Sequence, residues 1–99
     1  MEEIALKTQF STVVNWDEVR KVLDSALRHE ADLANARRTY FERACRAFEQ
    51  QYHMSSEEFM QQFESGALGD DAVYFDWYAA KRGLDLWERR FRILSGVKV

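Results

Sequence analysis

The clearest hydrophobic pattern in the chain lies close to its C-terminus. Apolar residues recur there in steps that alternate between four and three, namely at Val73, Trp77, Ala80, Leu84, Trp87, Phe91 and Leu94. Such a heptad repeat is typical of a helix that packs along a neighbouring helix. It predicts a helix over about residues 71–94, with Asp70 as the N-cap that precedes it.

A second apolar row lies on an adjoining side of this predicted helix. It is formed by Phe75, Ala79, Leu86 and Ile93. One neighbouring helix covers only one side of the helix, so a two-helix hairpin leaves the second row uncovered. We therefore interpret this row as a surface for a protein partner or for a second copy of the chain.

Another helical pattern occupies the first half of the chain. Apolar residues keep helical spacing over residues 16–52, and no Gly or Pro interrupts them. Asn15 stands before this segment, and its side chain suits the N-cap position. The pattern predicts one helix, roughly 55 Å long at 1.5 Å per residue. Glu30 and Arg37 interrupt the apolar stripe and mark the place where a bend is expected.

A short helix is predicted between the two long ones, over about residues 56–65. Ser55 and Glu58 have the spacing of a capping box, in which each side chain accepts a hydrogen bond from a free backbone N–H group. Gly66 suits the left-handed residue that follows a helix. The predicted fold class is therefore all-α, an antiparallel helical hairpin over residues 15–99. In it a short helix joins two long ones, and oligomerisation completes the fold.

The first 14 residues follow a different pattern. Hydrophobic and polar residues alternate there with a period of two, which is typical of a strand, and Ile4, Leu6 and Phe10 share one side. No other segment of the sequence predicts a strand. The hypothesis is an extended, β-like N-terminal arm over residues 1–14 that adds a strand to another chain through these three residues. The alternative is an extended or disordered tail.

Composition and charge narrow the functional classes. The 99 residues are 46% apolar, which is enough for the core of one small domain. A net charge of −3 argues against a protein that coats nucleic acid. The sequence contains no apolar run of about 20 residues and no pattern of a signal peptide. Together with a single cysteine, Cys45, these features predict a cytoplasmic protein that does not bind membranes.

Charge is unevenly distributed along the chain. Residues 47–80 contain seven acidic residues and no Lys or Arg, whereas residues 81–99 contain six basic and two acidic residues. Opposite charges speed the encounter of two proteins and fix the register of binding. The acidic segment therefore favours a basic partner.

The sequence contains no motif that indicates catalysis or metal binding. His29 and His53 have no second ligand one helical turn away, so they predict no metal site. Cys45 lies on the apolar side of its predicted helix, where a buried, unreactive thiol is expected. We therefore predict no enzyme activity, no catalytic residue and no cofactor.

An arginine cluster in the first long helix is the candidate for nucleic-acid binding. It comprises Arg37, Arg38, Tyr40, Arg43 and Arg46. Arginine and aromatic side chains can bind phosphates and stack on bases. Arg37 and Arg38 point about 100° apart on a helix, so the cluster forms no single basic face. Pairing with the acidic start of the last helix is the preferred interpretation, and RNA binding is the weaker alternative.

Residues 52–80 carry a distinctive series of short motifs. These are Met-Ser-x-Glu-Glu-Phe from Met54, Phe-Glu-x-Gly-x-Leu-Gly-Asp-Asp from Phe63, and Phe-x-Trp from Phe75. The series resembles short helical proteins of bacteria and archaea, many of which are encoded next to a small toxin and are taken to be its antitoxin. The matching residues suit capping, turns and packing, so the resemblance implies a hairpin corner and no active site. The chain lacks an obvious helix-turn-helix or ribbon-helix-helix domain, which argues against transcriptional autoregulation.

The leading hypothesis is a non-catalytic, antitoxin-like interaction module that binds a small basic toxin, such as an RNA-cleaving one. Its contacts would come from the arm and from the second row of the last helix. The first alternative is a self-assembling, homodimeric helical bundle. The second is an RNA-binding hairpin that uses the arginine cluster.

Overall fold

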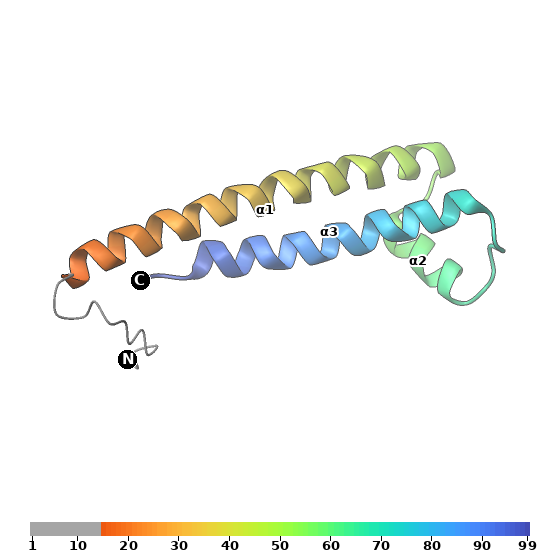
Figure 1. The fold of residues 1–99 in the computed structure, drawn as a ribbon. Coiled ribbons are helices and arrows are strands. Elements are labelled where there is room, and N and C mark those ends of the chain that lie inside the picture. The colour runs from red at the N-terminus through yellow and green to blue at the C-terminus, as the bar shows by residue number, and fades with distance from the viewer. Residues whose placement is uncertain (1–14) are drawn as a thin grey trace.

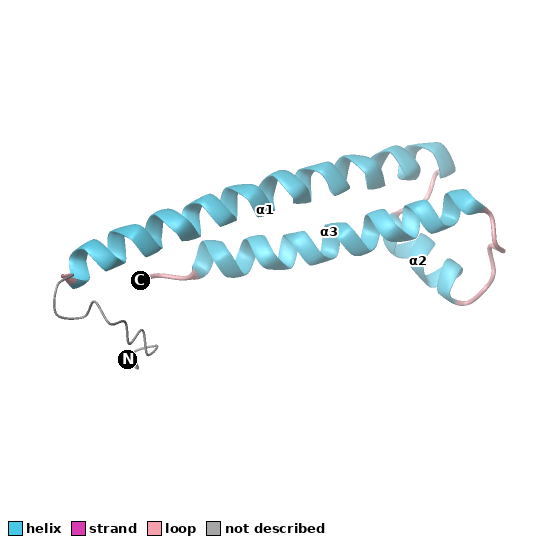
Figure 2. Cartoon of the chain, viewed as in Figure 1, coloured by secondary structure: helices cyan, strands magenta, loops and turns pink. Residues whose placement is uncertain are grey.

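The chain folds into three helices over residues 15–99, the part that the structure, a computed structural model, describes. They are α1 (Trp16–Tyr52), α2 (Ser56–Glu64) and α3 (Ala72–Gly96). Figures 1 and 2 show α1 and α3 side by side in opposite directions, with the short α2 at the end where the chain turns back. The predicted all-helical hairpin is confirmed over these residues. The predicted arm, with Ile4, Leu6 and Phe10, lies outside them and stays a prediction.

Local sequence determines where α1 begins. The Asn15 side chain accepts a hydrogen bond from the Glu18 N–H at 2.8 Å, which satisfies one of the free donors of the first turn. The helix then continues unbroken for 37 residues, through both Glu30 and Arg37. It ends before His53, whose φ of 55° is left-handed and turns the chain away from the helix axis.

The predicted capping box starts α2. The Ser55 hydroxyl accepts from the Glu58 N–H at 3.1 Å, and the Ser55 N–H donates to the Glu58 carboxylate at 3.4 Å. The helix ends at Glu64, one residue earlier than predicted. Gly66 follows with a φ of 83°, the left-handed conformation that glycine adopts without steric cost.

The N-cap of α3 differs from the prediction by one residue. The backbone is still extended at Asp71, with φ −62° and ψ 139°, and Asp71 is the N-cap. The prediction of Asp70 is wrong because the first helical hydrogen bond joins the Tyr74 N–H to the Asp71 carbonyl, at 3.0 Å. The Asp71 side chain makes no capping hydrogen bond, so this helix start lacks the support that the other two have.

The hairpin is a rod with little interior. It measures 62 × 22 × 20 Å, and its radius of gyration is 19.9 Å, against about 13 Å for a compact domain of 100 residues. Few of the described residues are therefore buried. They lie in the middle of the rod and at the end where α2 joins the two long helices, called the corner end below. They are Ala31, Ala34, Cys45, Ser56, Phe59, Trp77 and Ala80.

The heptad seam of α3 packs against α1 as predicted. Trp77 and Ala80 are buried, and the other five seam residues are half-buried. The two helices are in close contact at Gly83, where an added Cβ atom would lie 2.7 Å from the ring of Phe41. The absence of a side chain at Gly83 thus makes room for an aromatic ring of α1.

Candidate interaction surfaces

The second row of α3 lies largely on the surface. Phe75 and Ile93 are 54% and 59% exposed, and Ala79 is exposed as well. Leu86 is half-buried. α1 therefore covers one apolar row of α3 and leaves the other available to another molecule.

The short helix α2 borders this row at the corner end. The ring of Phe63, on α2, meets the ring of Phe75 edge to face, with 5.1 Å between centroids. Phe75 thus has a ring contact with α2 while more than half of its surface stays exposed. An exposed aromatic side chain suits an anchor in an interface.

Negative charge surrounds the corner end. Five acidic residues there are exposed and form no ion pair with another described residue: Glu58, Glu64, Asp70, Asp71 and Asp76. Asp76 directly follows Phe75 in the sequence. Asp71, the N-cap of α3, stands one helical turn before Phe75, so the exposed ring and exposed carboxylates without an ion-pair partner share this end of the described chain.

One acidic residue of the corner is paired, and the pair joins α2 to α3. The Lys81 ammonium group lies 2.9 Å from the Asp85 carboxylate and 3.3 Å from that of Glu57. Burial alone would lower the pKa of Lys81, but its hydrogen bonds to Asp85 and Glu57 outweigh burial and raise it. The pKa of Glu57 is lowered, first by a backbone hydrogen bond and then by Lys81.

A polar network lies inside the aromatic corner. The indole N–H of Trp77 donates to the Ser56 hydroxyl at 2.9 Å, and the Ser56 N–H donates to the Glu49 carboxylate at 3.0 Å. The Phe59 ring stacks on Trp77 with 4.0 Å between centroids. Sequence reasoning missed the Ser56 hydrogen bond because its partner lies 21 residues away, beyond any local pattern.

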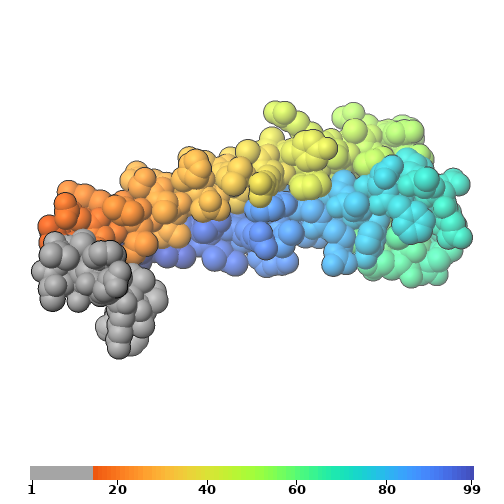
Figure 3. All heavy atoms as spheres, viewed as in Figure 1, coloured from red at the N-terminus to blue at the C-terminus, as the bar shows by residue number. Residues whose placement is uncertain are grey.

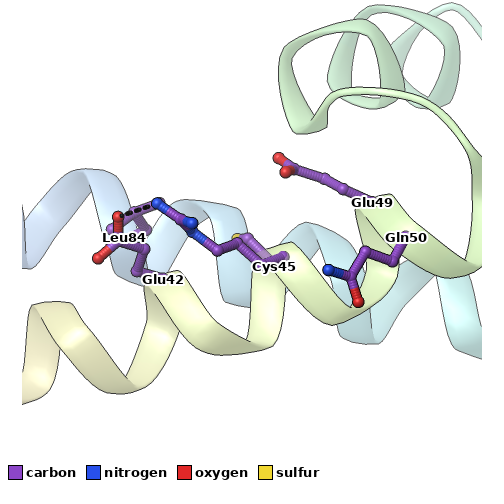
Figure 4. A pocket seen from close by; sticks show the side chains of 6 residues that line it. Glu42, Cys45, Glu49, Gln50 and Leu84 are labelled. Carbon is purple, nitrogen blue, oxygen red and sulfur yellow. Dashed lines mark hydrogen bonds and ion pairs between the residues drawn. The ribbon is translucent and has the colours of Figure 1, made fainter.

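A hollow of about 340 Å³ lies beside this network. Figure 4 shows its lining side chains, among them Glu42, Cys45 and Glu49 from α1 and Leu84 from α3. Burial raises the pKa of the Cys45 thiol, and a hydrogen bond with Ser56 offsets this only in part. A thiol with a raised pKa stays protonated at neutral pH and is a poor nucleophile. Cys45 is therefore the buried thiol of low reactivity that the sequence predicts.

Two further kinds of site are absent from residues 15–99. No group of three His, Cys, Asp or Glu side chains in this part of the chain lies close enough together to hold a metal ion. No helix of the same part is both long and apolar enough to cross a bilayer. A second hollow, of about 430 Å³, is lined by residues between positions 24 and 32 of α1 and between positions 91 and 99, among them Leu27, Phe91 and Val99.

The arginine cluster is partly used within the hairpin. Arg38 donates to Asn35 at 2.8 Å and pairs with Glu42 at 3.3 Å, and Arg46 pairs with the same Glu42 at 3.2 Å. The expected partners at the acidic start of α3 are not the ones observed. Residues one turn away on α1 are closer, which is the usual arrangement for helical pairs.

The other members of the cluster, Arg37, Tyr40 and Arg43, are all exposed and differ in their contacts. The Arg37 guanidinium lies 4.6 Å from the ring centre of Trp87, and Arg90 lies 4.9 Å from the same ring. Tyr40 is 68% exposed, and Arg43 is exposed too. Four of the five residues, Arg37, Tyr40, Arg43 and Arg46, are thus exposed and Arg38 is half-buried, and RNA binding by the cluster stays a prediction.

Comparisons with models of protein families, with curated proteins and with solved structures gave no match.

Proposed function

We propose that this chain is a non-catalytic, antitoxin-like interaction module that binds a small basic protein toxin. The observation that carries the proposal is the exposed Phe75 ring, which shares its end of the hairpin with exposed carboxylates that have no ion-pair partner in the described chain. Apolar anchors supply most of the affinity of an interface. The surrounding charge selects a partner of opposite sign.

The chemistry of this surface fits an RNA-cleaving toxin. A protein that binds RNA presents basic side chains to the phosphates, and the same side chains can be covered by carboxylates such as Asp71 and Asp76. The row formed by Phe75, Ala79, Leu86 and Ile93 extends the contact along α3. The resemblance of residues 52–80 to antitoxin-like proteins points to the same class of partner.

Co-expression tests the proposal. The chain is produced together with the product of each gene that flanks its own, and growth and complex formation are measured. We expect one of these products to arrest growth alone and to form a complex with the chain that restores growth. The proposal is wrong if neither product binds the chain.

Substitutions then locate the contact. Phe75→Ala and Asp76→Lys should each weaken the complex about tenfold or more, because they remove an anchor and reverse a neighbouring charge. Val99→Ala and Glu88→Lys are matched controls, since both side chains are exposed elsewhere on the hairpin. A complex that tolerates Phe75→Ala and Asp76→Lys would place the toxin on another surface.

The N-terminal arm is proposed as a second contact. If Ile4, Leu6 and Phe10 add a strand to the toxin, deletion of residues 1–14 lowers the affinity while the helical content stays unchanged, because Asn15 still caps α1. Hydrogen exchange at residues 4–14 should slow only in the complex. Fast exchange in both states would leave the row on α3 as the whole interface.

A further inference from the structure

The first helix carries a second apolar stripe that nothing in the hairpin covers. It consists of Val22, Ala26, Leu33, Ala36, Tyr40 and Ala47, all of them exposed, with Val22 and Tyr40 each at 68%. With His29 and Arg43, these residues occupy eight successive positions of a heptad repeat. The stripe is about 37 Å long, and its three to four heptads match the length at which a coiled coil is recognised, about three to four repeats.

The stripe points away from α3. Leu33 belongs to the stripe, whereas Ala34, the next residue, is buried against the hairpin core. Successive residues of a helix point about 100° apart, so the two apolar sides of α1 diverge by roughly this angle. Figure 3 shows that α1 forms one long edge of the molecule.

We propose that a second copy of this chain packs on this stripe, with the two α1 helices antiparallel. In the register centred between Ala34 and Asn35, large side chains lie opposite small ones. Leu33 faces Ala36 of the second copy, and Val22 faces Ala47 of the second copy. Alternation of large and small residues is what lets two helices interdigitate without voids.

His29 and Arg43, the two polar members of the stripe, favour an antiparallel over a parallel arrangement of the two α1 helices. In a parallel pair the two His29 side chains would face each other, and so would the two Arg43 side chains. The like charges of the two arginines would then meet in the seam. The antiparallel register places Arg43 opposite Ala26 and His29 opposite Tyr40. The long Arg side chain can then extend past alanine to water.

Charges at the border of the stripe fit the same arrangement. Glu30 and Arg37 are both exposed, and neither is in an ion pair with another described residue. Within the hairpin the Arg37 guanidinium contacts the face of the Trp87 ring, 4.6 Å from the ring centre, which leaves its charge without a carboxylate partner. They occupy the flanking positions that face each other in the antiparallel register. Each dimer therefore gains two symmetric pairs between Glu30 of one copy and Arg37 of the other.

The second row of α3 suits self-association less well. A heptad repeat through Phe75 and Ile93 passes through Arg82 and Arg89, which would put four arginines into the seam of a dimer. The stripe on α1 would put two arginines into the seam, one from each copy. The dimer thus uses α1 and leaves the toxin surface on α3 free, so this inference does not rest on the proposed function.

Sedimentation equilibrium of the full chain tests the dimer. Between about 1 and 500 μM the mass should rise from monomer to dimer. Leu33→Glu and Tyr40→Glu should each raise the dissociation constant at least about tenfold, because each puts a carboxylate into the apolar seam. Ile93→Glu is the matched control on α3 and should leave association unchanged. A monomer at all concentrations overturns the proposal, and so does a dimer that only Ile93→Glu dissociates.

A charge exchange tests the direction. Glu30→Lys and Arg37→Glu should each weaken the dimer, because each places like charges opposite each other. The double variant should restore association to within about threefold of the native value, since it re-forms both pairs with their signs exchanged. Circular dichroism confirms that the variants keep their helical content. A double variant weaker than both single ones overturns the antiparallel register.

Discussion

Trp77 is the residue that joins all three helices. Its side chain is 1% exposed, stacks on Phe59 of α2 and lies 5.5 Å from the ring centre of Phe48 on α1. Trp77→Ala should lower the free energy of unfolding by about 3–5 kcal/mol, the usual cost of removing a buried aromatic ring. Trp87→Ala should cost less, because Trp87 is only half-buried. Urea unfolding of both variants checks this order, and equal losses would contradict it.

The hydrogen bond between Trp77 and Ser56 should be visible in a double-mutant cycle. Ser56→Ala leaves a buried indole N–H without a partner, so we expect a loss of about 1–3 kcal/mol. In a Trp77→Phe background the same substitution should cost much less, because no donor remains to be satisfied. Thermal or urea unfolding of the native protein, the two single variants and the double variant gives the coupling free energy between Ser56 and Trp77. A coupling near zero would show that Ser56 acts through packing alone.

Lys81 should make stability depend on pH in the alkaline range. Its pKa is raised in the folded chain, so its contribution is complete below the unfolded pKa of about 10.4 and is lost as pH rises through the folded value. Lys81→Met should flatten this alkaline loss. Lys21→Met is the control, since Lys21 is exposed and forms no ion pair among the described residues. An equal loss of stability at alkaline pH for the native protein and for Lys81→Met would contradict the prediction.

Glu57 should make stability depend on pH in the acid range, in the opposite direction to Lys81. Its pKa is lowered in the folded chain, so its contribution is present above the unfolded value of about 4.3 and is lost as pH falls. The Glu57 side chain is 73% exposed, so solvent screens its ion pair with Lys81. The loss of stability at acid pH should therefore be smaller than the loss at alkaline pH.

At the scale of elements, the contact between α1 and α3 depends on Gly83. Alanine favours a helix by about 1 kcal/mol over glycine, so Gly→Ala on an open helix surface stabilises. At Gly83 the new Cβ would lie 2.7 Å from the Phe41 ring, so Gly83→Ala should lower the melting temperature. Gly96→Ala is the control, because no atom lies within 4 Å of the added Cβ there. A stabilised Gly83→Ala would show that Phe41 can move aside.

Local signals predicted the helices well, because caps and heptads are local. Asn15, Ser55 and Gly66 determine where helices begin or end, and each is recognisable from its neighbours alone. Contacts between elements were not predictable in the same way. The contact between Gly83 and Phe41 depends on the register of the hairpin, which no residue of either helix specifies alone.

The candidate surfaces, too, were predictable from the sequence only in part. The second row of α3 was recognised because its residues are large and apolar, and the structure leaves Phe75, Ala79 and Ile93 exposed. The stripe on α1 was missed because alanines and two polar residues conceal its period. Only the exposure of all eight positions revealed it.

At the scale of the whole molecule, the rod should not be equally stable along its length. The buried residues of α1 lie between Ala31 and Cys45, and those of α3 are Trp77 and Ala80. The open end, where α1 begins and α3 ends, contains no fully buried residue among those described. Regions with few buried contacts open more easily than the rest of a fold.

Hydrogen exchange should therefore follow a gradient. At about 1 μM we expect the amides near Cys45 and Trp77 to exchange slowest, and those of residues 18–28 and 88–96 to exchange much faster. At about 500 μM the dimer should slow exchange in residues 18–28 of α1, because Val22 and Ala26 become buried there. Residues 88–96 of α3 serve as the internal control and should change less. A gradient that does not depend on concentration would support the uneven stability and contradict the α1 dimer, whereas uniform exchange along both helices would contradict the gradient itself.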